Sequence, residues 1–146
     1  QTEEVPASRS ALMSRIRSRD TQPELAVRSL VHSLGYRFRI HVKNLAGKPD
    51  LVLPKYRTVI FVHGCFWHQH PGCPRATLPK SRTDYWHPKL KRNAERDREQ
   101  VAVLRREGWS VLTVWECETR DVGTLAKRVS RHLRARLKRI TPPSAD

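Results

Sequence analysis

The residues best suited to chemistry lie in one short stretch, 59–73, which reads Val-Ile-Phe-Val-His-Gly-Cys-Phe-Trp-His-Gln-His-Pro-Gly-Cys. It begins with an apolar run, typical of a buried strand, and then changes to three histidines, two cysteines and an adjacent aromatic pair. Imidazole and thiolate together suit zinc, and aromatic rings beside basic residues suit stacking on nucleic-acid bases. We therefore expect a metal site, a reaction centre and a base-stacking wedge to meet here.

The metal ligands are expected to be Cys65, His70 and Cys73, with Cys117 joining them from just past the end of a later strand. Four such ligands would make a closed tetrahedral zinc site of the structural kind, which ties a loop to the sheet. Three cysteines cannot all pair within one chain, so a reducing compartment with a metal fits better than secretion. The alternative is three buried free thiols beside a surface histidine.

A candidate hydrolytic centre begins at Gly47-Lys-Pro-Asp50, which is followed by a strand, a turn and a second strand. This is the outline of a restriction-endonuclease active site, where the acid binds Mg²⁺ against the scissile phosphate. The usual acid and lysine of the second strand are absent, and Val62-His63-Gly64 stands there instead. His63 and His68 are imidazoles that could replace the lysine as general base.

The aromatic pair Phe66-Trp67 lies at the end of the predicted strand, where both rings are not expected to enter one core. Insertion between base pairs is one interpretation, because apolar wedges unstack base steps and kink a duplex. The other is one core residue and one residue at the rim.

Several elements must position these residues. A capping box, Thr21-Gln-Pro-Glu24, predicts a helix that Gly35 ends. Residues 44–48 read as a turn, and 70–86 as a long loop that a metal would hold in place. Periodicity predicts further helices at 88–107 and 120–140 and strands at 36–42, 49–53, 58–62 and 109–115.

The helix at 88–107 has one unusual member in its apolar stripe. Asp97 places a carboxylate where the period requires an apolar side chain, in line with Leu90, Ala94, Val101 and Leu104. A buried carboxylate needs a partner. We therefore expect Asp97 to face a polar site.

The charge balance favours a nucleic-acid partner. Lys and Arg number 29 against 14 acids, which gives a net charge of +15 and a pI near 10.9, and each neutralised phosphate releases counterions. A merely soluble basic protein and a membrane-surface binder are the alternatives. The sequence contains no run of about twenty apolar residues, so it predicts no membrane-spanning helix.

The length of 146 residues predicts one main domain. We expect a basic arm or helix at 1–20 that contacts DNA, the main domain at 21–140 and a disordered tail at 141–146. The opening residues are unlike a secretory leader, so the expected location is the cytoplasm, beside the bacterial nucleoid.

Six motifs in consistent order resemble the very short patch repair (Vsr) endonucleases over roughly residues 8–118. They are Met13-x-x-Ile-x-x-Arg-Asp-Thr21, Gly47-x-Pro-Asp50, Val59-Ile-Phe-x-His-Gly-Cys-Phe-Trp-His68, Arg82-Thr-x-x-Trp86, Asn93-x-Glu-Arg-Asp97 and Gly108-Trp-x-Val-Leu-x-Val-Trp-Glu-Cys117. The resemblance implies an α/β, restriction-endonuclease-like fold, a central mixed sheet flanked by helices with a structural zinc site. It also implies a monomer that makes a Mg²⁺-dependent nick 5′ to the thymine of a T:G mismatch, which arises by deamination of 5-methylcytosine. Other repair proteins are expected partners.

The resemblance also implies roles for single residues at the reaction centre. Asp50 would bind magnesium together with the backbone carbonyl of Val62, where the family usually has threonine. His68 would be the general base, oriented by Asp97, and His63 a second imidazole near the phosphate. A further acid of the family corresponds to Glu24, which the capping box explains equally well.

At the zinc site the resemblance implies the ligands Cys65, His70, Cys73 and Cys117. Gln69 interrupts the family's histidine run, and Pro71-Gly72 changes the residues before Cys73. For DNA, Phe66 and Trp67 would intercalate beside the mismatch from one groove and Met13 would approach from the other.

Two alternatives remain at this stage. One is a related nickase of the same fold with a different mismatch or sequence target. The other is a zinc-stabilised DNA-binding module without catalysis, which the absent acid and lysine favour and which His68 with Asp97 argues against.

Overall fold

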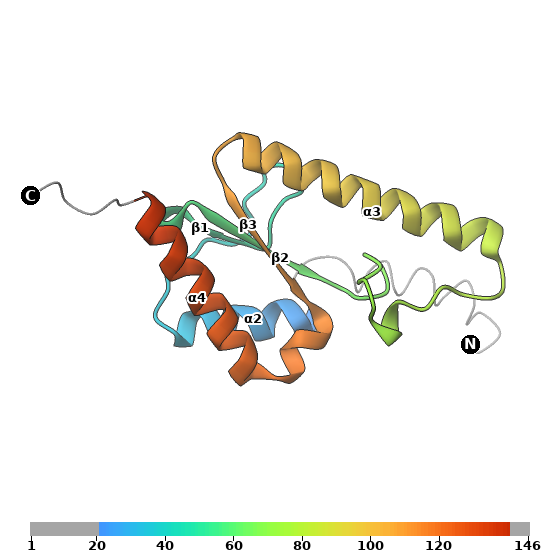
Figure 1. Cartoon of the computed structure of the whole chain (residues 1–146), viewed down its shortest axis with the longest axis horizontal. Coiled ribbons are helices and arrows are strands. Elements are labelled where there is room, and N and C mark those ends of the chain that lie inside the picture. Colours follow the sequence, from blue (N-terminus) through green and yellow to red (C-terminus); the bar gives the residue numbers. More distant parts are fainter. Residues whose placement is uncertain (1–20, 141–146) are drawn as a thin grey trace, which may run out of the picture.

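The computed structural model describes residues 21–140, which form a three-stranded sheet and its covering helices (Figure 1). The predicted arm at 1–20 with Met13, and the predicted tail at 141–146, lie outside the described residues. The elements in chain order are α2 (Gln22–Ser33), β1 (Leu51–Leu53), the 3-10 helix η2 (Pro54–Tyr56), β2 (Thr58–His63), η3 (Pro74–Ala76), α3 (Thr83–Arg106), β3 (Ser110–Trp115), η4 (Glu116–Arg120) and α4 (Val122–Ile140).

The sheet is mixed, as expected, with β2 at its centre. β1 and β2 form the predicted antiparallel hairpin, in which Leu51 pairs with Ile60. Arg57 turns the chain with a φ of 46° in the left-handed region. β2 and β3 run parallel, because the long crossover through α3 lies between them.

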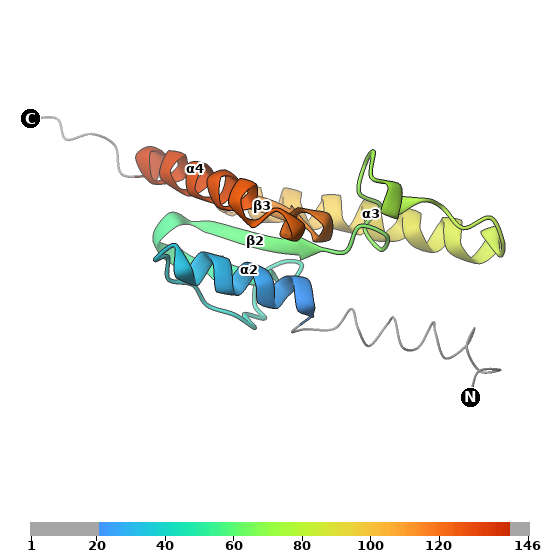
Figure 2. The ribbon, with the colours of Figure 1, turned by 90° about the horizontal axis from the view of Figure 1, so that it is seen from below.

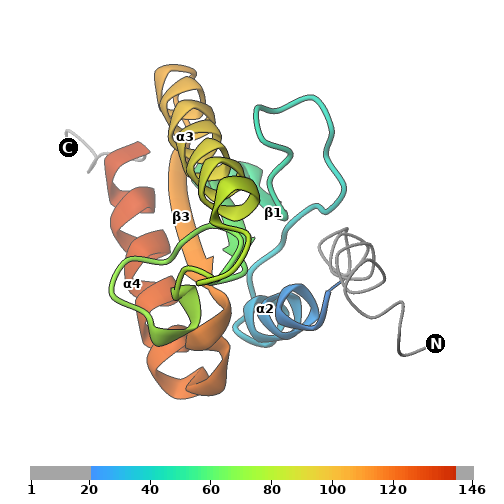
Figure 3. The same ribbon diagram turned by 90° about the vertical axis from the view of Figure 1, so that its right-hand side faces the viewer.

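The helices cover both faces of the sheet, as Figures 2 and 3 show. α2 and α4 pack on one face, where Val31 and Val129 join Ile60 in the larger core. α3 packs on the other face, where Leu104 meets Val59 and its strand neighbours in a second core. Successive side chains of β2 point to opposite faces, so one apolar strand supplies both cores. No helix among residues 21–140 has the length and apolar character to cross a membrane.

The start of α2 confirms the predicted cap. The Thr21 hydroxyl accepts a hydrogen bond from the backbone N–H of Glu24, 3.4 Å away, and Pro23 lies in the first turn, where its missing N–H costs nothing. Gly35 follows the helix with a φ of +90°, a conformation that L side chains rarely adopt. The helix therefore ends where the sequence predicts.

Two sequence predictions are wrong. Residues 36–42 do not form a strand: only Arg39 bridges to Val52, because His41 takes a φ of 58° and breaks the extended backbone. α3 begins at Thr83 rather than 88, so Pro88 lies inside the helix and the loop ends at 82. The Trp86 ring packs within 5.6 Å of the Phe66 ring, and this contact stabilises a first turn that a proline alone would not predict.

Candidate functional site

A cavity of about 530 Å³ opens at the carboxyl end of β2 and brings together residues that are far apart in the sequence. Its walls come from α2, from the segment before β1, from the end of β2 and the turn after it, and from α3. All the residues predicted for the reaction centre line it: Glu24, Asp50, Val62, His63, His68 and Asp97.

Asp50 is held at the entry to β1 by the central strand. Its backbone N–H donates to the carbonyl of Ile60, and its Oδ2 accepts from the backbone N–H of Val62 at 2.7 Å. The pKa of the Asp50 carboxyl is raised to about 7, mainly by burial and also by nearby Glu24, although the Val62 hydrogen bond and Arg28 oppose the rise. The site therefore holds a carboxylate whose charge is poorly solvated.

Glu24 lines the cavity and also lies in the capped first turn of α2. It is 5% exposed, and its Oε1 lies 3.3 Å from the Arg28 guanidinium, one turn further along α2. It lines the same cavity as Asp50 and raises the pKa of that carboxyl. Two adjacent carboxylates beside the Val62 backbone are hard oxygen donors, so the residues fit a magnesium ion.

Two imidazoles stack on the other side of the cavity. The rings of His63 and His68 lie 3.8 Å apart and nearly parallel, at 6°. His68 Nδ1 lies 2.5 Å from Asp97 Oδ2, so Asp97 has the polar partner that its place on the apolar stripe predicts. An ionised carboxylate only accepts hydrogen bonds, so Nδ1 carries the proton and Nε2 of His68 is left as the basic atom.

His63 is neutral in this setting. It is 7% exposed, at the last position of β2. The pKa of His63 is lowered to about 3, mainly by burial and also by His68, although Asp97 opposes the shift. A neutral ring can donate one hydrogen bond and accept another without adding charge to the cavity.

The opposite shifts of Asp50 and His63 predict how pH affects the stability of the magnesium-free protein. Asp50 has a pKa of about 7 when folded against an ordinary 3.8, so its contribution to stability falls as pH rises between these values. His63 has a pKa of about 3 against 6.5, so its contribution rises with pH between those values. In the wild type, the pH dependences of these two contributions to stability therefore oppose each other.

Asp50→Asn removes one side of this balance. We expect the free energy of unfolding of the variant to rise with pH more steeply than that of the wild type, by up to about 1.4 kcal/mol per pH unit. Urea unfolding of both proteins at several pH values between about 4.5 and 6.5 measures the difference, and effects common to both proteins cancel. Parallel curves would contradict it.

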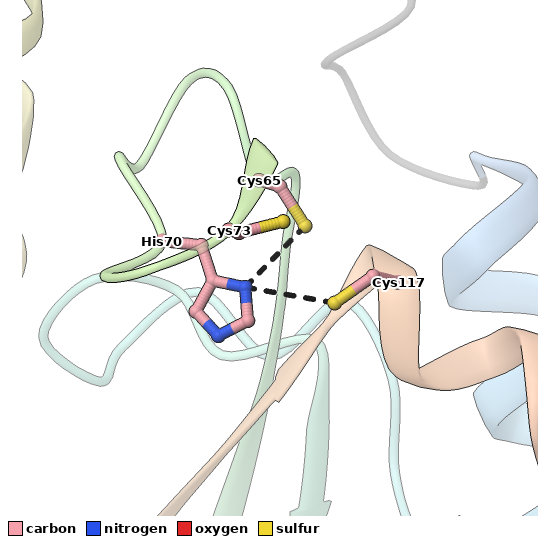
Figure 4. Close-up of side chains that lie close together, drawn as sticks. All are labelled: Cys65, His70, Cys73 and Cys117. Atoms are coloured by element: carbon pink, nitrogen blue, oxygen red, sulfur yellow. Dashed lines mark hydrogen bonds between the residues drawn. The ribbon is translucent and has the colours of Figure 1, made fainter. Parts of the chain in front are cut away.

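The predicted zinc ligands meet beside this cavity (Figure 4). The ligand atoms of Cys65, His70, Cys73 and Cys117 all lie within 4.8 Å of one another. His70 Nδ1 is 3.7 Å from the sulfur of Cys65 and 3.5 Å from that of Cys117, and a sulfur–nitrogen edge of a tetrahedral zinc site is about 3.6 Å. This donor set fits zinc.

The surroundings of the four ligands support a metal. The His70 ring stacks on the Trp115 ring at 4.2 Å, which fixes its orientation. Burial raises the pKa of the Cys65 thiol to about 12, whereas a hydrogen bond from the backbone of Arg75 lowers that of Cys73. A metal that displaces the thiol protons would bind all three sulfurs as thiolates.

The aromatic pair takes two different environments in the unbound protein. Trp67 is 7% exposed, and its carbonyl accepts a hydrogen bond from the Asn93 side chain at 3.3 Å. Phe66 is half-buried, and both rings pack against Trp86 of α3. This arrangement matches the interpretation of one core residue and one rim residue, and intercalation stays a prediction for the DNA-bound state.

The structure adds residues to the cavity that sequence reasoning missed. Arg28, Lys48 and Arg96 line it and bring positive charge beside the carboxylates. Arg28 follows Glu24 by four residues on a helix, so the ion pair had a sequence signal. Lys48 and Arg96 are near neighbours of Asp50 and Asp97, but no pattern marks which basic residues turn inward.

A cavity of carboxylates and imidazoles at the edge of a mixed α/β sheet, in a strongly basic chain, defines the class as a DNA endonuclease. The comparisons agree: the model of the DNA mismatch endonuclease Vsr family matches residues 4–75. The chain belongs to this family.

Similar proteins lead to the same assignment. The chain is 53% identical to the type II nicking enzyme V.XorIIP of Xanthomonas oryzae pv. oryzae, over 95% of this chain and 96% of that one. It is 46% identical to DNA mismatch endonuclease Vsr of Escherichia coli K12, over 78% of this chain and 72% of the relative.

A solved structure shares the fold. The catalytic domain of the homing endonuclease I-Bth0305I superposes with a TM-score of 0.56 at 16% identity, covering 81% of this chain and 99% of that one.

Proposed function

We propose that this protein nicks one strand of duplex DNA 5′ to the thymine of a T:G mismatch by Mg²⁺-dependent hydrolysis. The observation that best supports the proposal is that Asp50, His68 and Asp97 line one cavity, because hydrolysis of this kind needs a metal-binding acid and an oriented base in the same site. The relative named a DNA mismatch endonuclease supports a mismatch as the target, and the relatives named nicking enzymes support a cut in one strand. The T:G identity of the mismatch is proposed from the family resemblance.

The Asp50 carboxylate and the Val62 carbonyl would hold the magnesium ion, with Glu24 close enough to add an oxygen. Bound there, Mg²⁺ would offset the charge that develops on the scissile phosphate and lower the pKa of attacking water. The proton on Asp50 competes with the ion, because the pKa of this carboxyl is about 7. Arg28 keeps the two carboxylates together before the ion arrives.

His68 would take a proton from the attacking water. Its Nδ1 is engaged by Asp97, so Nε2 is presented as the acceptor and the ring cannot turn freely. The stacked ring of His63 supports that of His68 and stays neutral, so it can donate a hydrogen bond near the phosphate. Asp97 acts through His68, as a positioning residue.

Selectivity is assigned to the aromatic pair. Phe66, the more exposed ring, would enter the stack at the mismatch, and Trp67 would support it from the cluster with Trp86. Unpaired or mismatched bases cost less to unstack than matched ones. Met13 would approach from the opposite groove.

Zinc is proposed for the four-ligand site, with a structural role. His68 and the aromatic pair lie between Cys65 and His70 in the chain, so this site holds the turn that carries both the base and the wedge. One copy of the chain acting alone would leave the second strand intact. A cytoplasmic location near the nucleoid belongs to the same proposal.

The decisive experiment is nicking of a labelled T:G duplex by the zinc-loaded protein with Mg²⁺, compared with matched C:G and T:A duplexes in several flanking sequences. We expect a single nick 5′ to the mismatched thymine and none in the complementary strand. Cutting of matched duplexes at the same rate, or of a different mismatch in preference, would show a nickase with another target. Binding without any product would show a module without catalysis.

His68→Ala tests the general base. We expect a fall in kcat of about 10²- to 10⁴-fold with little change in affinity for the T:G duplex, because the base acts on the proton of the water and not on the DNA. Single-turnover nicking measures the chemical step, and duplex titration measures affinity. Added imidazole should restore part of the rate.

The matched control for this experiment is His32→Ala, at an exposed position in the last turn of α2. It should nick at the wild-type rate. Asp97→Ala should lower kcat less than His68→Ala, because the base remains but loses the carboxylate that orients it. A His68→Ala protein with the wild-type rate would remove His68 from the mechanism.

A further inference from the structure

α4 has two faces of opposite character. Its inner face contributes Leu125, Val129 and Leu133 to the core, and all three are at most 2% exposed. Its outer face carries a row of exposed cations at positions i, i+4, i+7 and i+11, which lie above one another on a helix. We call this row the outer basic row: Lys127, Arg131, Arg134 and Lys138.

These four charges have few partners in the fold, although the charge of Lys127 helps to lower the pKa of Asp121. Within residues 21–140, no side chain of the outer basic row makes a hydrogen bond or an ion pair. Two other arginines of the helix differ: Arg128 pairs with Glu118 at 2.8 Å, and Arg136 donates to the carbonyls of Tyr56 and Gly108. These two cations are structural, whereas the four charges of the outer basic row are left for something outside the domain.

The outer basic row destabilises the helix through repulsion between its charges. α4 contains no Asp or Glu, so its like charges at i and i+4 repel each other without relief from an acid on the same face. The helix dipole favours cations only in the last turn, which accounts for Lys138 but not for Lys127 or Arg131. An anionic partner would remove the repulsion.

The outer basic row lies away from the candidate active site. The cavity is lined by α2, by the segment before β1, by the end of β2 with its following turn, and by α3, and no lining residue comes from α4. Figure 3 shows α4 on one side of the molecule and the segment that leads into β1 on the other. A duplex seated in the cavity would thus leave the row free.

We infer that the outer basic row is a second DNA-binding surface, which holds the phosphate backbone of a separate duplex segment without reading its sequence. The row spans about 16 Å along the helix axis, a length that faces roughly four or five phosphates of one strand. DNA is already the partner of this endonuclease family, and the row matches its charge. The row has no aromatic or large apolar side chain, the usual anchor of a protein–protein interface.

Such a surface lets one molecule hold two duplex segments at once. The protein could then pass from a segment without a target to a neighbouring segment without first dissociating into solution. The dissociation rate from one duplex should therefore rise with the concentration of a second duplex. This inference extends beyond the nicking reaction and does not depend on which mismatch is cut.

The test uses the full zinc-loaded chain without Mg²⁺. The cavity is first filled with one equivalent of a short unlabelled T:G duplex, and a labelled matched duplex is then titrated in. We expect the wild type to take up the second duplex with a stoichiometry of one protein to two duplexes by sedimentation. The variant Lys127→Gln, Arg131→Gln, Arg134→Gln, Lys138→Gln should bind it at least tenfold more weakly, with a salt slope smaller by up to about 3.6.

The matched control exchanges the cations and keeps the charge: Lys127→Arg, Arg131→Lys, Arg134→Lys, Lys138→Arg. It should behave as the wild type, and all three proteins should nick a short T:G duplex at the same saturated rate, because the row is outside the cavity. Circular dichroism checks that the glutamine variant keeps its helix. The inference fails if the wild-type complex takes up no second duplex, or if the glutamine variant takes it up equally. It fails too if polyglutamate at physiological salt binds the row more tightly than DNA does.

Discussion

Asp50→Ala should abolish nicking of a T:G duplex while binding of that duplex largely persists. Loss of a metal-binding carboxylate removes several kcal/mol of transition-state stabilisation, and each 1.36 kcal/mol is a factor of ten in rate. We therefore expect kcat to fall by at least about 10³-fold. Affinity should change little, because the positive charge of the chain and the aromatic pair do not depend on this side chain.

The experiment combines single-turnover nicking with titration of the duplex, over a range of magnesium concentrations. Saturating Mg²⁺ should not restore the nicking rate of Asp50→Ala, whereas it would restore the rate of a variant that only has a lower affinity for Mg²⁺. Asp84→Ala, at an exposed position in the first turn of α3, is the matched control and should keep the wild-type rate. Full activity of Asp50→Ala would overturn the assignment of the reaction centre.

Loss of the proposed zinc site should be the largest effect on stability. Cys117 reaches the other ligands from η4, so Cys117→Ser removes the link between the 65–73 segment and the end of β3. Structural zinc supplies a large part of the folding free energy of small zinc domains. This domain has two apolar cores of its own, so we expect it to remain folded but to lose more than about 4 kcal/mol.

Nicking should be lost together with the metal, because His68 lies between two of the ligands in the chain. Metal analysis should find one zinc per wild-type chain and much less in Cys117→Ser, and thermal unfolding should show the loss of stability. A strong chelator should produce the same change in the wild type. His87→Ala, which changes an exposed histidine of α3, should retain its zinc. Wild-type protein that contains no zinc as purified, and whose melting temperature the chelator does not change, would favour the alternative of three free thiols.

The loss of nicking in Asp50→Ala and the loss of zinc in Cys117→Ser should be separable, although the two sites lie beside each other. Asp50→Ala should leave the zinc content unchanged, because its carboxylate is held by Val62 and belongs to the cavity. Cys117→Ser should reduce both zinc and activity, because the turn that carries His68 loses an anchor. A loss of zinc in both variants would show that the two centres do not fold independently.

Short-range sequence signals determined the types of the functional residues and many of the elements around them. The cap at Thr21, the hairpin of β1 and β2 and the apolar period of α4 are local patterns, and the structure confirms each of them. The cluster of three cysteines and His70 was also predictable from the sequence, because thiols without disulfide partners beside an imidazole are a typical metal-binding set. The polar surroundings of Asp97 were predictable too, because its carboxylate interrupts an apolar helical stripe.

Tertiary structure alone decided which of these residues meet and what charge they carry. Asp50 precedes β1, and Glu24 approaches it from α2. Burial, together with the charge of Glu24, raises the pKa of the Asp50 carboxyl to about 7, a shift that no local pattern contains. Packing of Trp86 against Phe66 lets α3 start before Pro88. The positive φ of His41 prevents the strand that the alternation of residues 36–42 predicts. Local sequence sets conformational preference and chemical type, whereas distance and desolvation arise only when segments far apart in the chain pack together.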